Sequence, residues 1–327
     1  MCEVLRAGRG QLLGLTVSYP TNIAPKPPRR VNETVLAWAA VAVTMMIWAS
    51  FLIVTRAAAT AQLGPVDVGL LRFVPAALLF APIWLRRSPL PPGARPIEIV
   101  TIALTGGFAF VFLLSWGMRY APVADSGVFA PSMLPFHVAV LSFFLLGERF
   151  SRMRIAGFVM ILAGALGIGG WDIVHNADAG AWPGHLLFSL AAILWACYTV
   201  AYKRSNIKPV DAAAMICFWS SLAFLLLLLV MPSRIPATPP STLALQVVMQ
   251  GVLSGFVSTM TYGYALSRIA PSKVAACAAL VPVMAAVGGW VFLGEQLGPA
   301  KAFGIGVVAT GVLLASGAVR ARQRTAG

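Results

Sequence analysis

The chain has 327 residues, of which 59% are hydrophobic and only 10% are charged, and its formal net charge is +14. Soluble domains carry about a quarter charged residues, so this composition excludes an ordinary soluble protein. It favours a helical membrane protein, because an apolar helix of about 20 residues crosses a bilayer with its backbone hydrogen bonds satisfied internally.

The chain begins with a polar segment, residues 1–34, that is rich in proline and in basic side chains. Its apolar run, Leu12–Val17, is too short for the core of a signal peptide, and no Ala-x-Ala cleavage site follows it. We therefore expect residues 1–34 to form a disordered cytoplasmic tail.

Apolar stretches long enough to cross a bilayer follow this tail. They lie at about 35–55, 65–85, 97–117, 124–146, 152–171, 182–202, 210–231, 245–266, 273–293 and 299–319. A short basic segment, residues 320–327, ends the chain. The sequence thus predicts an all-α polytopic membrane protein with ten transmembrane helices between two cytoplasmic tails.

The basic residues predict the orientation, because cytoplasmic loops of membrane proteins carry an excess of Lys and Arg. With the N-terminus inside, most Lys and Arg fall in cytoplasmic loops. The exceptions are Arg56, Arg119, Arg234 and Lys301 outside, and Arg72 within a span. We expect both termini in the cytoplasm and the protein in the cell membrane, such as a bacterial inner membrane, in contact with membrane lipid. The net charge therefore does not indicate a nucleic-acid partner.

An internal repeat relates the two halves of the chain. The stretch at 146–168 recurs at 293–315, and the same offset of 147 residues aligns Trp48 with Trp195. Spans one to five therefore correspond to spans six to ten.

The second copy is expected to cross the membrane in the opposite direction, because five is an odd number of spans. The loop charges agree with this inversion. Several arginines follow Glu148, whereas only Lys301 follows Glu295. Inverted repeats give one architecture two mirror-related packings that open alternately to either side, as in secondary transporters.

The repeated features also resemble a known family. Each copy has a tryptophan in its first helix, Ala-Pro before its fourth, a proline within the fourth, then Leu-Gly-Glu and a glycine-spaced fifth helix. In this chain they are Trp48 and Trp195, Ala121-Pro122 and Ala270-Pro271, Pro135 and Pro282, Leu146-Gly147-Glu148 and Leu293-Gly294-Glu295, and Gly157 and Gly164 with Gly304 and Gly311. The set resembles the EamA-type members of the drug/metabolite transporter superfamily over about residues 35–319.

The resemblance implies two EamA-like five-helix repeats, at residues 35–171 and 182–319. It also implies cytoplasmic termini, a central cavity at the repeat interface, and export or exchange of small metabolites or drug-like solutes. The substrates of this family are diverse, so the resemblance does not name one.

The first candidate site residues lie in spans one and six. Trp195, Tyr198, Thr199 and Tyr202 recur at i, i+3, i+4 and i+7, on one helical face, and Trp48 is the repeat partner of Trp195. Hydroxyl groups facing lipid would lack partners, so this face is expected to line a cavity. Aromatic packing with tyrosines near the membrane interface is the alternative.

Span eight has the most polar face. Ser254, Ser258 and Tyr262 recur every four residues. This stripe is predicted to form a cavity wall; the alternative is that the hydroxyls bond to their own helix or join helices.

Span four carries Phe129, Met133 and His137 on one stripe, between Pro131 and Pro135. Prolines interrupt the helix hydrogen bonds and leave carbonyls that need partners or line a cavity. His137 is a candidate for substrate binding or proton coupling, since the reference pKa of histidine lies near neutrality. A neutral histidine bonded to a freed carbonyl is the alternative.

Arg72 is the only basic residue within a span. Such an arginine is costly in lipid and usually faces protein or water. It is a candidate partner for an anionic group of the substrate, such as a carboxylate; alternatively it reaches the outer interface or bonds to helix ends.

The remaining polar and small residues are expected to be structural. Glu148 and Glu295 precede helix starts on opposite membrane faces, and Asp125 is expected to cap span four. The glycines of spans five and ten let helices approach closely, and they allow a homodimer through these helices. No pair among the four cysteines has metal-site spacing, so we expect neither a metal nor a cofactor.

A carrier for a small organic solute is the function that these features favour. An intramembrane enzyme is the first alternative, but the sequence has no H-E-x-x-H, no G-x-S-x-G and no carboxylate pair at the same depth. A non-transporting receptor or scaffold is the second, but the loops are short. Neither alternative needs two mirror-related halves.

Overall fold

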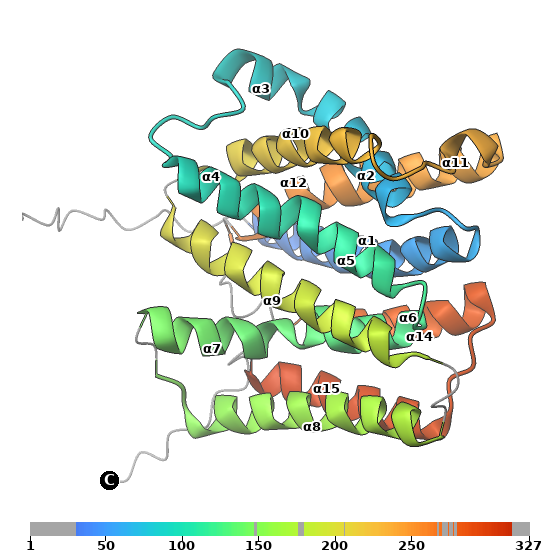
Figure 1. Ribbon diagram of the computed structural model, residues 1–327. Coiled ribbons are helices and arrows are strands. Elements are labelled where there is room, and N and C mark those ends of the chain that lie inside the picture. The colour runs from blue at the N-terminus through green and yellow to red at the C-terminus, as the bar shows by residue number, and fades with distance from the viewer. Residues whose placement is uncertain are drawn as a thin grey trace, which may run out of the picture.

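The structure is a computed structural model that describes part of the chain. The described residues are 31–146, 149–175, 180–205, 207–266, 268–269, 274, 277 and 280–315. Within these ranges the chain is helical and contains no strand, which confirms the all-α prediction (Figure 1). The two predicted tails, apart from residues 31–34, and Glu148 lie outside the described residues.

Nine helical segments lie between Val31 and Leu146, including two short π-helices, η1 and η2. They are α1 (Val31–Thr60), α2 (Pro65–Leu79), α3 (Ala81–Arg87), α4 (Pro96–Ala103), η1 (Leu104–Phe108), α5 (Ala109–Gly117), α6 (Val123–Gly127), η2 (Val128–Ser132) and α7 (Leu134–Leu146). Helix α1 begins before the predicted position 35; Glu33 lies in its first turn, where a carboxylate complements the helix dipole.

The second half begins after α8 (Arg152–His175), which is the fifth predicted span. The helices among its described residues are α9 (Trp182–Arg204), α10 (Pro209–Leu227), the 3₁₀-helix η4 (Ile235–Ala237), α11 (Pro240–Gln246), the π-helix η5 (Val247–Val257), α12 (Ser258–Leu266), α14 (Leu280–Leu293) and α15 (Pro299–Ala315). Each of the ten predicted stretches therefore contains helix. The start of the ninth stretch, before Leu280, lies largely outside the described residues.

Several of these helices are long and apolar enough to cross a membrane, so the protein is a multi-pass membrane protein. Six segments of the described chain meet this requirement on their own: Glu33–Thr60, Pro96–Gly117, Val123–Leu141, Trp182–Tyr202, Pro209–Leu227 and Pro240–Ala265. A seventh candidate is the pair of α2 and α3, which meet at a bend of 63°. The helices α14 and α15 are apolar but shorter.

The bend between α2 and α3 divides what the sequence predicts as one helix at 65–85. It lies at Phe80, and Pro82 follows it as one of the first residues of α3. Proline lacks the N–H that would continue the hydrogen bonds of α2, so it is tolerated at the start of a new helix. Arg86 and Arg87 at the end of α3 are exposed, and Arg87 Nη1 lies 3.2 Å from Asp211 Oδ1 of α10.

The internal repeat is visible in the backbone. The π-helix η1 covers residues 104–108, and the longer π-helix η5 includes residues 251–255, which lie at the same offset of 147 residues. Because π-helices are uncommon in proteins, their recurrence at matching positions supports the assignment of the two copies.

The packing of the helices repeats in the same way. Helix α1 packs against α12 and α14, while its counterpart α9 packs against α5 and α7. Helix α2 packs against η5, while its counterpart α10 packs against η1 and α4. Helices α2 and α10 also contact each other, as do α8 and α15. Exchanging the two copies thus leaves these contacts unchanged.

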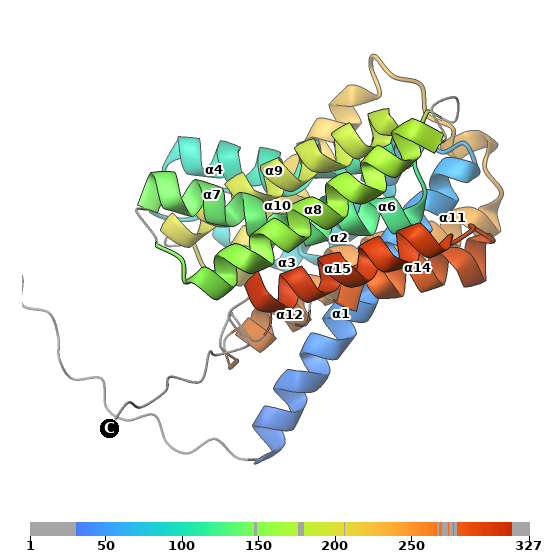
Figure 2. The ribbon, with the colours of Figure 1, turned by 90° about the horizontal axis from the view of Figure 1, so that it is seen from below.

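Helices α8 and α15 lie side by side at one edge of the bundle (Figures 1 and 2). A Cβ atom on Gly157 would lie 2.6 Å from the carbonyl oxygen of Gly311, and one on Gly311 would lie 2.8 Å from that of Gly157. The predicted packing role of these glycines is confirmed, and it operates within the chain. A homodimer through these helices stays a prediction.

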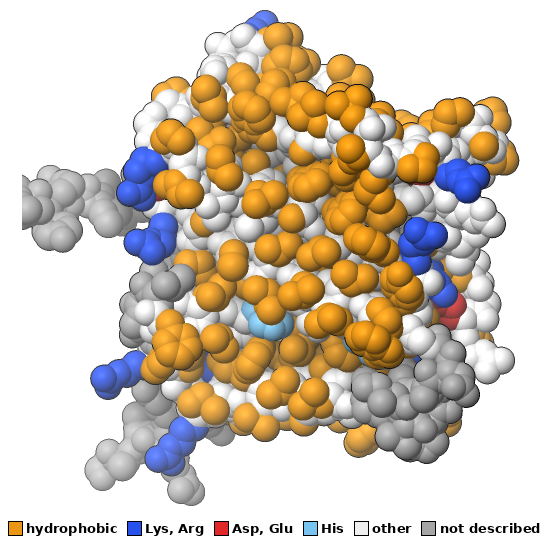
Figure 3. Space-filling model, in the orientation of Figure 1, with side chains coloured by type: hydrophobic (Ala, Val, Ile, Leu, Met, Phe, Trp, Pro, Cys, Tyr) orange, Lys and Arg blue, Asp and Glu red, His pale blue; other side chains and the backbone are white. Residues whose placement is uncertain are grey.

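The surface and core match a protein that lies in lipid. Figure 3 shows hydrophobic side chains over the middle of one face, with Lys and Arg mainly at two opposite edges. The buried hydrophobic side chains form two clusters, one around α1, α6, α9, α14 and α15 and one around α2 and α10. The cavity described next is lined mainly by residues of the first cluster.

Candidate functional site

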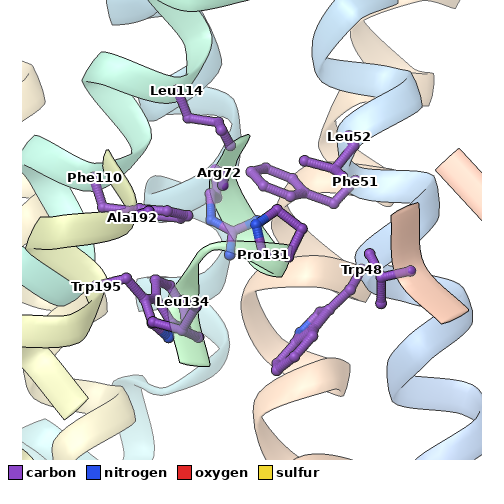
Figure 4. Close-up of a pocket in the computed structure, with 12 residues that line it drawn as sticks. Trp48, Phe51, Leu52, Arg72, Phe110, Leu114, Pro131, Leu134, Ala192 and Trp195 are labelled. Carbon is purple, nitrogen blue, oxygen red and sulfur yellow. The ribbon is translucent and has the colours of Figure 1, made fainter. Parts of the chain in front are cut away.

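A cavity of about 70 Å³ lies between the two copies of the repeat. Figure 4 shows side chains from both copies converging on it. Its lining residues are Trp48, Phe51, Leu52, Arg72, Phe110, Leu114, Ala130, Pro131, Leu134, Ala192, Trp195 and Val281. Trp48 and Trp195 are equivalent positions of the repeat, and so are Leu134 and Val281, so the cavity lies on the approximate two-fold axis.

Aromatic rings make up much of its wall. Trp48 of α1 and Trp195 of α9 meet edge to face, with ring centroids 6.5 Å apart and an interplanar angle of 79°. Phe110 of α5 contacts Trp195, with ring centroids 4.5 Å apart. Tilted and edge-to-face aromatic contacts are energetically favourable and hold the rings in fixed positions. The wall is therefore a rigid apolar surface.

Arg72 is the only ionisable residue among the lining residues. Its guanidinium carbon lies 4.3 Å from the ring centroid of Phe51, and its Nη1 donates a hydrogen bond to Ser254 Oγ of η5. Its Nε is buried and has no hydrogen-bond partner. In Figure 4 its guanidinium group points between the side chains of α1 and those of α5 and α9.

Two other candidate residues contact the aromatic wall of the cavity, and a third stacks on one of them. Tyr262 packs on Trp48 with ring centroids 5.2 Å apart, and Tyr198 packs on Trp195 at 5.3 Å. Tyr202 stacks on Tyr198 at 5.9 Å. The aromatic face predicted from spans one and six therefore exists, and it extends from the cavity along α9.

Two predicted hydroxyl residues are bonded within their own helices. Thr199 Oγ1 donates to the Trp195 carbonyl oxygen at 2.8 Å, and Ser258 Oγ donates to the Ser254 carbonyl oxygen at 2.7 Å. This is the alternative that the sequence left open for such residues. Of the serines in this stripe, Ser254 is the one that contacts a residue lining the cavity.

The stripe predicted in span four does not face the cavity. Phe129 stacks on His185 with ring centroids 4.5 Å apart, and Met133 lies in the hydrophobic core. His137 meets Phe136 edge to face at 5.4 Å. Residues on other faces of this span, Ala130, Pro131 and Leu134, line the cavity in their place. The π-helix η2 interrupts the α-helical period within this span. Residues that a regular 3.6-residue period places on one face therefore do not share the face that lines the cavity.

Sequence reasoning missed two buried glutamines in the second copy. Gln250 Nε2 donates to Thr55 Oγ1 at 3.0 Å, and Gln246 Nε2 donates to the Val54 carbonyl oxygen at 3.1 Å. With Ser254 they continue the same stripe, since 246, 250 and 254 are four residues apart. The four-residue spacing that singled out Ser254 could have found both.

Ionic contacts join the two copies at one end of the bundle, which we call the distal end: the end where α1 ends and α15 begins. Arg56 Nε lies 3.1 Å from Glu295 Oε1, and Arg56 also donates to the Met118 carbonyl oxygen. Glu295 Oε2 accepts the N–H of Val123 at 2.9 Å. Glu295 therefore complements the start of α6 in the other copy, and not the start of its own next helix.

A second distal contact surrounds Asp125, which is only 1% exposed. His185 Nε2 lies 2.8 Å from Asp125 Oδ2, and Lys301 Nζ lies 2.9 Å from Asp125 Oδ1. These three residues come from α6, α9 and α15. The carboxylate thus joins three helices, whereas the sequence predicts a simple helix cap, because spacing along one helix does not reveal partners on others.

Comparison with known proteins identifies the repeats. The EamA-like transporter family matches residues 35–170 and again residues 182–317. A solved crystal structure aligns with a TM-score of 0.61 at 20% identity, covering 89% of this chain and 100% of that chain. This likeness supports the fold alone.

Several relatives are named as transporters. The chain is 28% identical to the uncharacterized transporter YoaV of Bacillus subtilis over 70% of this chain and 79% of that protein. It is 28% identical to a probable terminal-alkyne amino-acid exporter of Streptantibioticus cattleyicolor over 88% of this chain and 96% of that protein. The aromatic amino acid exporter YddG of Ancylobacter novellus is 28% identical over 38% of this chain and 43% of that protein.

The family match, the doubled backbone pattern and the cavity between the copies agree with one another, and they indicate a transporter more than an enzyme. The chain belongs to the EamA-like transporter family, with two copies of the family's repeat.

Proposed function

We propose that the protein is a secondary active transporter that exports or exchanges a small organic solute by alternating access. In this proposal it crosses the cell membrane ten times, with both termini in the cytoplasm and the two repeats inverted. The observation that carries the proposal is the cavity between the repeats, lined by equivalent residues such as Trp48 and Trp195.

The helix contacts of one copy recur in the other copy, and this symmetry supports alternating access. Two mirror-related halves can adopt either of two mirror-related packings around a fixed site, and each packing opens the site to one side. The distribution of Lys and Arg supports the orientation, because it places the distal end outside.

The distal contacts support a closed outer side. They are few, they are ionic, and they join the repeats through Arg56–Glu295 and Asp125–Lys301. The cavity of about 70 Å³ is smaller than the roughly 300–1,000 Å³ of typical ligand pockets. Passage of a solute therefore requires the helices around the cavity to separate, and outward release requires the distal contacts to break.

The relatives guide the choice of solute. Two of them are named as exporters of amino acids. We therefore infer that amino acids and related small carboxylates are the first solutes to test, followed by sugars, nucleosides and cationic drugs.

The test is solute exchange by the purified protein in lipid vesicles, with radiolabelled solute outside and excess unlabelled solute inside. A substitution that fills the cavity, Ala192→Leu, is expected to abolish exchange, because Ala192 lines the cavity and is 1% exposed. Ile193→Leu, at the next position of α9, is the matched control, because the Ile193 side chain is 39% exposed and is not among the lining residues. Exchange of no solute class by the unaltered protein, or full activity of Ala192→Leu, would contradict the proposal.

A further inference from the structure

Among the described residues, no acid pairs with the charge of Arg72. The ion pairs among the described residues do not include Arg72, and the cavity lining contains no Asp or Glu. Arginine stays protonated in proteins, so the positive charge persists. A charge removed from water is costly unless it is paired, and the cost is relieved when an anion binds.

The contacts of Arg72 leave part of its donor set free. The guanidinium has five N–H donors. One is used on Ser254 Oγ, the Nε donor is buried without a partner, and the face of the group lies on Phe51. A guanidinium fixed by stacking and by one hydrogen bond presents its other donors in a plane, which matches the two oxygens of a carboxylate.

The rest of the cavity is unsuited to a cation. Its other lining side chains are aromatic or aliphatic. The ammonium group of an amino acid would find no carboxylate there, and the faces of Trp48 and Trp195 would offer only a cation–π contact, worth about 0.5–2 kcal/mol. The aromatic and aliphatic wall instead suits the apolar body of a solute.

From this geometry we propose that the cavity selects organic monoanions, in which one carboxylate pairs with Arg72 and an apolar or aromatic body packs against Trp48, Phe110 and Trp195. Zwitterions of the same shape bind more weakly, and cations of that shape do not bind. This substrate class rests on the proposed transport function, but binding can be tested without transport.

The experiment compares three probes that share a benzene ring: 3-phenylpropionate, phenylalanine and phenethylamine. 3-Phenylpropionate carries only a carboxylate, phenylalanine carries a carboxylate and an ammonium group, and phenethylamine carries only an ammonium group. Binding to the purified protein is measured as the increase in thermal stability with ligand concentration, because a ligand that binds only the folded state stabilises it. Vesicle exchange of the same probes is measured in parallel.

We expect apparent affinity to fall in the order 3-phenylpropionate, phenylalanine, phenethylamine. In Arg72→Gln the affinity for 3-phenylpropionate is expected to fall by about 30-fold or more, which corresponds to the loss of one buried charge-assisted contact. Arg119→Gln is the matched control, because Arg119 is an exposed arginine, and it should leave all three affinities unchanged.

Further variants keep the test decisive if Arg72→Gln does not fold. Arg72→Lys keeps the charge and loses the planar pair of donors, so it should bind 3-phenylpropionate at reduced affinity and still reject phenethylamine. Ser254→Ala keeps Arg72 and should lower affinity by less than Arg72→Gln.

The outcomes separate the two proposals. Carboxylate-dependent stabilisation without exchange of any probe would support the anion site and contradict the transport function. Exchange that favours phenethylamine, or an unchanged affinity for 3-phenylpropionate in folded Arg72→Gln or Arg72→Lys, would overturn the anion site and leave the transport function standing. Stronger binding of phenylalanine than of 3-phenylpropionate would also overturn it.

Discussion

At the scale of single residues, the contacts of Glu295 show how one carboxylate can hold two repeats together. It pairs with Arg56, which is only 21% exposed, and it also accepts the N–H of Val123. Hydrogen bonds between charged groups away from bulk water are stronger than those between neutral groups. Glu295 therefore joins the ends of α1 and α14 to the start of α6.

A double-mutant cycle tests this pair. Glu295→Gln and Arg56→Gln are each expected to lower the free energy of unfolding, and the double variant should lose less than the sum of the two losses. We expect a coupling free energy of about 0.5–3 kcal/mol, because the two side chains contact each other directly. The measurement is denaturation of the purified variants in detergent. Strictly additive losses would show that the pair contributes no stability.

The residue scale also marks the limit of what the sequence predicts about the site. Trp48, Arg72 and Trp195 were predicted from an aromatic face and a lone buried charge, and all three line the cavity. Phe129 and Met133 share a predicted face but lie against His185 and the core. A periodic stripe identifies residues that share a face of one helix; the neighbour that covers the face is determined by the packing of other helices.

At the scale of elements, the locations of helices were predictable and their irregularities were not. Long apolar runs predict helices because a chain in lipid must satisfy its own hydrogen bonds. The π-helices η1 and η5 depend on tertiary contacts. A Cβ atom on Gly106, within η1, would lie 2.5 Å from the ring of Tyr198, so this backbone segment is shaped by a neighbour from the other repeat.

Glycine substitutions in α8 test the close packing of elements. Gly157→Ala is expected to destabilise the protein by about 1–3 kcal/mol, because its Cβ would lie 2.5–2.6 Å from backbone atoms of Ala315 and Gly311, which cannot rotate away. Gly167→Ala, in the same helix, meets nothing within 4 Å and should be neutral or stabilising. The measurement is the midpoint of thermal unfolding. Equal effects of the two changes would contradict the packing that we describe.

At the scale of the whole molecule, the repeat places equivalent residues at opposite ends of the bundle. Ser151 and Gly298 follow the two Leu-Gly-Glu motifs at the same offset of 147 residues, and both positions are exposed. In the inverted arrangement that we propose, Ser151 faces the cytoplasm and Gly298 faces outside.

Labelling of single cysteines tests this inversion. In a variant whose four native cysteines are replaced by alanine, Gly298→Cys is expected to react with a membrane-impermeant maleimide on intact cells. Ser151→Cys should react only after the membrane is opened, because a charged reagent does not cross lipid. Reaction of both positions in intact cells would mean that the repeats are parallel, and alternating access by exchange of mirror-related packings would fail with them.

The contact between Arg72 and Ser254 has no charged counterpart in the other half. Since α2 begins at Pro65 and α10 at Pro209, Ile216 occupies the position equivalent to Arg72, and its side chain lies against Gly107, the equivalent of Ser254. With identical halves, an idle carrier would divide its time equally between facing inward and facing outward. In the alternating access that we propose, the arginine–isoleucine mismatch is one of the differences that remove this degeneracy, so it helps to decide on which side the empty carrier waits.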